Sequence, residues 1–149
     1  MKKMRFREVF PMRGVFTMRV YRNGKLIEVY KDNNLLVNGA KDAATHLLAG
    51  DSEGKHISKI GFGTSGNIPT PDDTAISSPF VKNISSVGYP ALGHAEFSWR
   101  LAESEANGKL IMEFGLFCED GTLFARKVRE KAIPKEPDIA LEGEWIIIF

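Results

Sequence analysis

Residues 15–31 read VFTMRVYRNGKLIEVYK, and this stretch decides the fold class. Phe16, Met18 and Val20 alternate with Thr17 and Arg19, and a period of two is typical of a strand that buries one face. The following Asn-Gly pair at 23–24 tolerates the positive φ angles that a two-residue hairpin turn requires. The return strand covers residues 25–31. The stretch therefore predicts an N-terminal β-hairpin.

The alternating pattern returns along the rest of the chain, separated by turns that contain glycine. Asp120-Gly121 is a second hairpin signal. Several short strands at regular spacing are typical of sandwiches and barrels. Further strands are expected at residues 56–63, 80–87, 94–101, 110–118, 122–128 and 141–149. We therefore predict a mainly β protein, an antiparallel β-sandwich with one packed α-helix and the N-terminal β-hairpin.

One segment has a helical period instead. Its apolar residues lie at i, i+3, i+4, i+7 and i+8, which is one face of a helix; they are Ala40, Ala43, Ala44, Leu47 and Leu48. Asn38 is a suitable N-cap and Gly50 a suitable stop, so the helix is expected near residues 38–49. Because the apolar face is mostly alanine, we expect the helix to lie close against a sheet.

The length of 149 residues fits a single domain, residues 1–149, which can bury about 68–70% of its unfolded surface. The lone Cys118 excludes an intramolecular disulfide and shares the apolar face of Phe114 and Leu116, so we interpret it as a small core residue. No apolar run approaches the ~18 residues of a membrane span, and the start of the chain does not read as a signal peptide. We expect a soluble globular protein made in a reducing cytoplasm.

The formal net charge of +1 hides an uneven distribution. Residues 1–31 carry nine basic side chains against Glu8 and Glu28, a local charge of +7. Residues 32–149 carry the remaining 11 basic side chains against 17 acidic ones, a local charge of −6. Such asymmetry bears on partners. We interpret residues 1–31 as a basic arm and hairpin, and residues 32–149 as a β-sandwich body.

A glycine motif at residues 61–66 has the G-x-G-x-x-G spacing of dinucleotide-binding loops. That motif needs a following helix and an acidic residue about 20 positions later. Here Pro69 and Pro71 follow, and the later region reads Val81-Lys82-Asn83. We therefore predict a strand that turns into a surface loop at residues 64–79.

Other candidate chemistry is weak in this sequence. Asp72 and Asp73 could bind Ca²⁺, but the site would need more oxygen ligands, so local capping is favoured. The three histidines do not have the spacing of a zinc site. Glu113 lies on the polar side of its strand and is interpreted as a solvent or interface carboxylate. We predict no catalytic, cofactor-binding or metal-binding residues and no enzyme activity.

The basic N-terminus permits two interpretations. Its Lys and Arg residues are interleaved with aromatic ones, as in some nucleic-acid surfaces. Alternatively, it is an arm that docks on an acidic neighbour and buries its apolar side chains there. An ordered terminus would favour docking, since chain ends are usually disordered unless they are tied down, and docking is the interpretation that we prefer.

The other end of the chain also points to assembly. Residues 145–149 are apolar on both faces, whereas a half-exposed strand should have one polar face. A neighbouring copy could cover the second face. The possible assembly contacts from both ends are Lys2, Lys3, Arg5, Phe6, Arg7, Phe10, Arg13, Ile146, Ile148 and Phe149.

Four segments within residues 33–149 carry a resemblance to known proteins. They are Asn34–Gly50 with its NLLVNGA entry, Ile60–Thr64 followed by Pro71–Ile76, Ile111–Phe117 followed by Leu123–Arg126, and Lys131 or Lys135 before the final Trp145–Phe149. Together they resemble small structural proteins of tailed bacteriophages and prophages, of the kind associated with the tail, baseplate or fibre attachment.

The resemblance implies a non-enzymatic virion protein of the phage tail, synthesised in the cytoplasm of the bacterial host. Its partners would be other tail subunits and copies of itself, because tail proteins form symmetric, repeated assemblies. The alternative is a binding module for a receptor glycan, through loop 64–79 or loop 129–138, or for nucleic acid.

Overall fold

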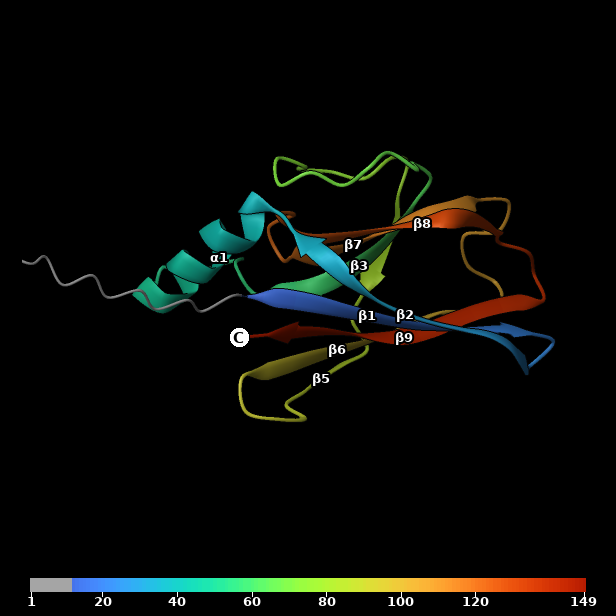
Figure 1. Cartoon of the computed structure of the whole chain (residues 1–149), viewed down its shortest axis with the longest axis horizontal. Helices are drawn as coiled ribbons and strands as arrows, with labels where there is room; N and C mark the ends of the chain where they lie inside the picture. The colour runs from blue at the N-terminus through green and yellow to red at the C-terminus, as the bar shows by residue number, and fades with distance from the viewer. Residues whose placement is uncertain (1–11) are drawn as a thin grey trace, which may run out of the picture.

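The computed structural model describes residues 12–149, which form an antiparallel nine-stranded sheet and one helix (Figure 1). The mainly β prediction with a single helix is confirmed for this part of the chain. The elements are β1 Arg13–Arg22, β2 Lys25–Leu36, α1 Asn38–Ala49, β3 Ile57–Gly63, β4 Phe80–Asn83, β5 Ser86–Gly88, β6 His94–Leu101, β7 Leu110–Cys118, β8 Leu123–Pro134 and β9 Ile139–Ile148. Their order in the sheet is β4-β3-β7-β8-β2-β1-β9-β6-β5.

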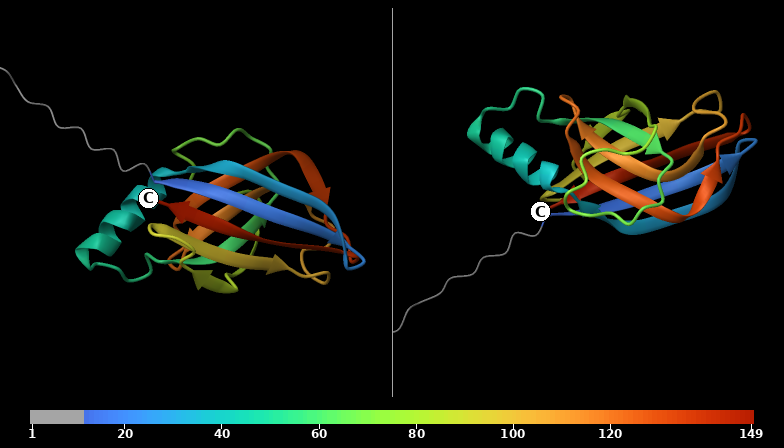
Figure 2. Two further views of the ribbon diagram at one scale, coloured as in Figure 1. Left: turned by 60° about the horizontal axis from the view of Figure 1, so that its bottom comes forward. Right: turned by 90° about the horizontal axis from the view of Figure 1, so that it is seen from above.

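The long strand β2 joins the two halves of the sheet. Most of β2 pairs with β1, whereas Leu35 and Leu36 at its end pair with Arg126 and Ala125 of β8. Because β2 belongs to both halves, the sheet is continuous and curls into a half-barrel (Figure 2). The structure therefore does not confirm the predicted sandwich of two separate sheets.

The basic segment is not set apart from the body where the structure describes it. β1 and β2 pair antiparallel around Asn23 and Gly24, which have φ angles of 51° and 75°. β1 also pairs with β9 along its whole length, from Arg13 to Arg22. These strands thus lie at the centre of the sheet, and a separate N-terminal hairpin is not confirmed. The predicted boundary at residue 31 falls inside β2.

The helix α1 begins and ends where the periodicity predicted, but its N-terminal cap differs. Val37 is the N-cap and makes no side-chain capping bond. Asn38 instead donates from Nδ2 to Oδ1 of Asp72, 2.9 Å away, in the loop after β3. Gly50 ends the helix with a φ of 80°, as predicted. A side chain at Gly39 would overlap the Leu123 carbonyl oxygen, so the helix lies directly against β8.

Two strand predictions were wrong in their extent. Residues 80–87 form two short strands, β4 and β5, on opposite edges of the sheet. β8 continues to Pro134, so most of the charged loop predicted at residues 129–138 is strand. The continuation follows from Ile133, which is buried and pairs with Ile111 of β7.

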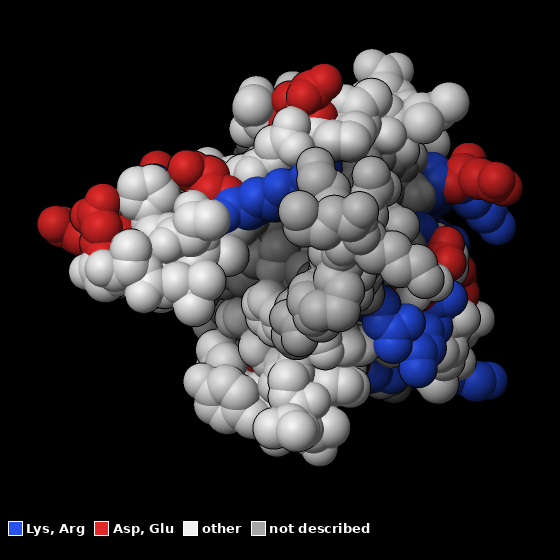
Figure 3. All heavy atoms as spheres, turned by 60° about the vertical axis from the view of Figure 1, so that its left-hand side comes forward, with Lys and Arg blue, Asp and Glu red and all other residues white. Residues whose placement is uncertain are grey.

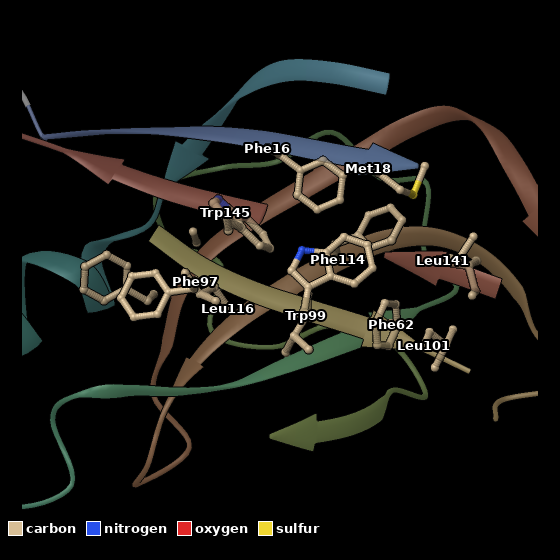
Figure 4. Packing of buried hydrophobic residues seen from close by; sticks show 14 of the residues in the cluster. Phe16, Met18, Phe62, Phe97, Trp99, Leu101, Phe114, Leu116, Leu141 and Trp145 are labelled. Carbon is tan, nitrogen blue, oxygen red and sulfur yellow. The ribbon is translucent and has the colours of Figure 1, made fainter. Parts of the chain in front are cut away.

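An aromatic cluster fills the concave side of the half-barrel (Figure 4). The ring of Phe16 lies 4.7 Å from that of Phe114 and 5.0 Å from that of Trp145, measured between centroids. The Trp145 indole N–H donates to Oδ1 of Asn34 at 2.8 Å. These contacts join β1, β7 and β9 across the sheet. Cys118 is fully buried in the same core, which confirms its interpretation as a core residue.

Candidate assembly surface

The C-terminus lies at the same end of the half-barrel as α1 (Figures 1 and 2). Residues of both segments line an apolar groove there. Its volume is about 370 Å³. Buried Phe97 and Ile147 form its floor, and Leu47, Tyr89 and Phe149 stand at its rim. The groove thus combines residues from α1, the β5–β6 connection and the end of the chain. We call this feature the α1-end groove.

The rim of the α1-end groove exposes large apolar side chains. Tyr89 is 82% exposed and Phe149 is 62% exposed. An adjoining hollow is lined by the β5–β6 connection and Phe149, and it includes Leu92, which is fully exposed. Single exposed apolar residues are ordinary, but a contiguous group of them marks a surface for interaction.

Backbone bonds fix the position of the rim. The Phe149 N–H donates to the Gly93 carbonyl oxygen at 3.0 Å, and the His94 N–H donates to that of Ala91 at 3.0 Å. Gly93 adopts a φ of 75°, which only glycine takes without strain, so the β5–β6 connection can turn here. The end of the chain is therefore held beside the β5–β6 connection, and the rim is preformed.

Acidic side chains, with basic ones beside them, gather over α1 and the turn that follows it (Figure 3). Asp42, Asp51 and Glu53 are exposed there. His46 lies between two of them, with Nδ1 3.0 Å from Asp51 and Nε2 3.4 Å from Asp42. In the same region, Lys55 pairs with Asp120 at 3.0 Å. The helix side of the groove therefore combines exposed carboxylates with an apolar wall.

The structure brings only some of the predicted assembly contacts to this surface. Phe149 stands at the groove rim. Arg13 begins β1 and pairs in register with Ile148. Ile146 and Ile148 point away from the core and are half-buried, beside Arg13 and Lys31. The other predicted contacts lie outside the described residues; they are Lys2, Lys3, Arg5, Phe6, Arg7 and Phe10. The question of whether that terminus is ordered also falls outside the described residues.

The C-terminal strand is covered on one face only. Trp145 and Ile147 are buried in the core, whereas the alternate residues Ile146 and Ile148 are not. Within the single chain the second face of the strand is therefore only half-buried. A covering neighbour stays a prediction.

Basic residues of β1 are neutralised by acids from the other end of the chain. The Arg19 guanidinium lies 2.9 Å from Glu144 and 3.3 Å from Glu142. Hydrogen bonds to Glu144 raise the pKa of Arg19, although burial opposes them. Arg22 pairs with Asp138 at 2.7 Å. Part of the local +7 therefore serves to hold the sheet together.

A buried polar network fastens loop 64–79 to the sheet. Glu113 is fully buried and accepts from Arg126 Nε at 3.0 Å and from the backbone N–H of Ser65 at 2.6 Å. Arg126 also binds Asp73 at 2.9 Å. The prediction of a solvent or interface carboxylate at Glu113 was wrong, because loop 64–79 covers that face of β7. The turn in this loop is closed by Asp73, which accepts from the Thr70 backbone N–H at 2.9 Å, so the capping prediction is confirmed.

The pKa of Asp73 reflects its place in this network. Burial alone would raise it, but hydrogen bonds from Thr70 and Arg126 outweigh burial and lower the pKa below the usual value. The carboxylate is thus kept ionised as a structural acceptor. The glycine motif serves the same loop, since a Cβ at Gly63 would lie 2.7 Å from Glu113 Cγ. The motif is the predicted strand end turning into a loop.

Lys135 is a further buried charge, and the sequence did not predict its burial. Its ammonium donates to the Glu103 carbonyl oxygen at 3.0 Å and to Asn107 Oδ1 at 2.9 Å. Burial lowers the pKa of Lys135. These hydrogen bonds hold the loop between β6 and β7 to the residue that follows β8. Lys135, one of the two lysines named in the resemblance, therefore has a structural role.

Among residues 12–149, no group of three or more His, Cys, Asp or Glu side chains is arranged to hold a metal ion. Within the same range, no helix has the length and hydropathy needed to cross a membrane.

Comparisons of the chain with protein families, with curated proteins and with solved structures find no match.

Proposed function

We propose that this protein is a non-enzymatic structural component of a bacteriophage tail, associated with the baseplate or the tail fibres. It is made in the cytoplasm of the bacterial host and assembles into the virion through contacts with other tail subunits and with copies of itself. The observation that carries the proposal is the α1-end groove, with its exposed rim of Tyr89, Leu92 and Phe149. The resemblance in residues 33–149 is the reason for naming a phage tail as the assembly.

Burial against a neighbour would stabilise such a rim. Removing apolar surface from water contributes roughly 25 cal/mol per Å². The two edges of the sheet add to this argument, because β4 and β5 are four and three residues long and present unpaired backbone groups. Very short edge strands limit unspecific pairing, and a specific neighbour can cover them.

The direct test is the composition of the virion. Particles would be purified from the host that carries the gene, and their proteins identified by mass spectrometry. The chain should copurify with tails in a fixed copy number, and a specific antibody should label one position on the tail. Complete particles that lack the chain would overturn the proposal.

The alternative is a module that binds a receptor glycan or nucleic acid, and the structure leaves fewer candidate loops for the glycan. Residues 129–134 belong to β8, so one of the two candidate glycan loops is mostly strand. Loop 64–79 is fastened at both ends by Glu113, which accepts from Ser65 and Ser77. Binding to a polysaccharide array, or DNA retardation that weakens steeply with salt, would favour the alternative.

A further inference from the structure

We infer that the α1-end groove is the receptor for residues 1–11 of a second copy of this chain. The inference deepens the proposed function, and it takes from that function only the assembly of like copies. It starts from the match between the groove and the N-terminal sequence. The groove is apolar and is flanked by carboxylates on α1 and its following turn. Residues 1–11 read MKKMRFREVFP, which combines large apolar residues with basic ones.

The apolar parts correspond in kind and size. The groove floor is formed by buried Phe97, Phe124 and Ile147. Half-buried Ile57 lines its wall, and Leu47 stands at its rim. The segment offers Phe6 and Phe10, spaced so that both would fall on the same face of an extended chain, since side chains repeat every two residues. Aromatic side chains seated in apolar pockets are the usual anchors of interfaces.

The charges also correspond. Residues 1–11 carry four basic side chains against Glu8, a local charge of +3. The helix side of the groove carries four carboxylates against two lysines, a local charge of −2; these residues are Asp42, Asp51, Glu53 and Asp120 against Lys41 and Lys55. Opposite charges around an apolar contact speed association and set its register more than they add affinity. The acidic side chains therefore orient the segment, and the groove holds it.

Geometry makes exchange between copies possible. β1 begins at Arg13, which pairs with Ile148 next to the groove rim at Phe149. Eleven residues can span at most about 36–40 Å when extended. This reach is enough to leave the parent domain and enter the groove of an adjacent copy. Because arm and groove are different surfaces, the contact is head-to-tail and builds a ring or an open filament.

The test uses two full-length variants that damage opposite sides of the contact. The arm variant carries Phe6→Ser and Phe10→Ser and keeps every charge. The groove variant carries Leu47→Gln and Tyr89→Ser at exposed rim positions. A matched control carries Leu48→Gln, because Leu48 neighbours Leu47 on α1 but is 88% exposed and does not line the groove.

Sedimentation equilibrium gives the masses alone and in mixture. The native chain and the Leu48→Gln control should reach at least twice the monomer mass. Each damaged variant should remain monomeric, with association weakened by at least about tenfold. An equimolar mixture of the two variants should form a species of twice the monomer mass, because one supplies the arm and the other supplies the groove.

Three results would overturn the inference. Association of the arm variant as strong as that of the native chain would show that another surface, such as a groove-to-groove contact, joins the copies. A mixture that stays monomeric would show that the arm does not enter a groove in trans. A monomeric native chain would point to an arm seated in its own groove or to no self-contact. The proposed function fails separately, when complete virions lack the chain.

Discussion

Glu113 provides the sharpest test of how this sheet is held together. Its carboxylate is fully buried, and its two oxygens accept from three donors. Oε1 accepts from Arg126 Nε at 3.0 Å, while Oε2 accepts from the backbone N–H groups of Ser65 at 2.6 Å and Ser77 at 3.0 Å. In Glu113→Ala all three donors lose this acceptor. Arg126 keeps only its bond to Asp73, 2.9 Å away.

The expected loss of stability follows from those contacts. Removing one partner of a buried ion pair leaves the other charge uncompensated and costs about 3–5 kcal/mol. The two backbone N–H groups add less, since Ser65 and Ser77 lie in a loop that water can reach. We therefore expect Glu113→Ala to lower the free energy of unfolding by about 3–5 kcal/mol, out of the ~5–15 kcal/mol that is usual for a domain.

The assay is equilibrium unfolding in urea, followed by tryptophan fluorescence. Trp99 and Trp145 are both buried, so their emission reports loss of the core. Linear extrapolation gives the free energy in water. The matched control is Glu130→Ala, an exposed glutamate on the strand that carries Arg126, and it should change stability by no more than about 0.5 kcal/mol.

A second comparison distinguishes the effect of an unpaired buried charge from the effect of lost side-chain volume. Replacing both partners, as Glu113→Leu with Arg126→Met, removes the buried charges together and should recover part of the loss. A loss below about 1 kcal/mol in Glu113→Ala, or one equal to that of Glu130→Ala, would refute the reasoning that the network fastens loop 64–79.

Three further predictions concern single positions. A methyl group at Gly143 would overlap a backbone carbonyl oxygen of β1, so Gly143→Ala should lower the free energy of unfolding in urea by about 1–3 kcal/mol or more. The control Gly88→Ala has open space around the new methyl group and should be nearly neutral; equal effects of the two substitutions would contradict this reasoning. Burial raises the pKa of the Cys118 thiol to about 11, so iodoacetamide at pH 8 should label it, by mass spectrometry, only after unfolding. Hydrogen bonds from Thr122 lower the pKa of Asp120 to about 2. Because this lies below the unfolded value of about 3.9, its stabilising contribution is complete above about pH 4 and is lost as the pH falls through 2; an NMR titration midpoint near 3.9 would exclude it.

The strands and the helix were largely predictable because their signals are local. Alternation in residues 94–101 and 110–118 depends only on which face is buried, and both strands form with these bounds. The stop at Gly50 depends only on its left-handed backbone. The curl of the sheet was not predictable, since it depends on Leu35 and Leu36 meeting β8 about 90 residues later.

Charged residues misled the sequence reasoning where tertiary contacts cover them. Lys127 and Arg129 are buried in β8, although charged side chains favour a surface position. Lys127 lies 2.6 Å from Asp32, and Arg129 lies 2.6 Å from Glu28, both in the neighbouring strand β2. The Arg129 guanidinium also stacks over Tyr30, 4.8 Å from the ring centroid. Such partners, about 100 residues away, leave no trace in the local pattern.

The α1-end groove was equally hidden. Among its rim residues, only Phe149 was predicted to be an assembly contact, on the ground that the last strand is apolar on both faces. Leu47 was assigned to the packed face of α1, yet it is 42% exposed because α1 contacts the sheet chiefly through its smaller residues Ala40 and Ala43. Because small alanine side chains make the contact between α1 and the sheet, the larger apolar side chain of Leu47 lies beside the sheet and is not buried under it. The groove is the direct result.

The uneven charge of the sequence acquires two separate explanations in the folded chain. Arg19 and Arg22 form ion pairs with the C-terminal region, in and just before β9, so their excess charge is cancelled within the sheet. Residues 1–11 hold four of the nine basic side chains of the first 31 residues and precede the strand that does this cancelling. Their charge of +3 is therefore additional to that of Arg19 and Arg22, which the C-terminal region neutralises. An exposed acidic surface next to an apolar groove is the complement of that segment, and identical copies present both.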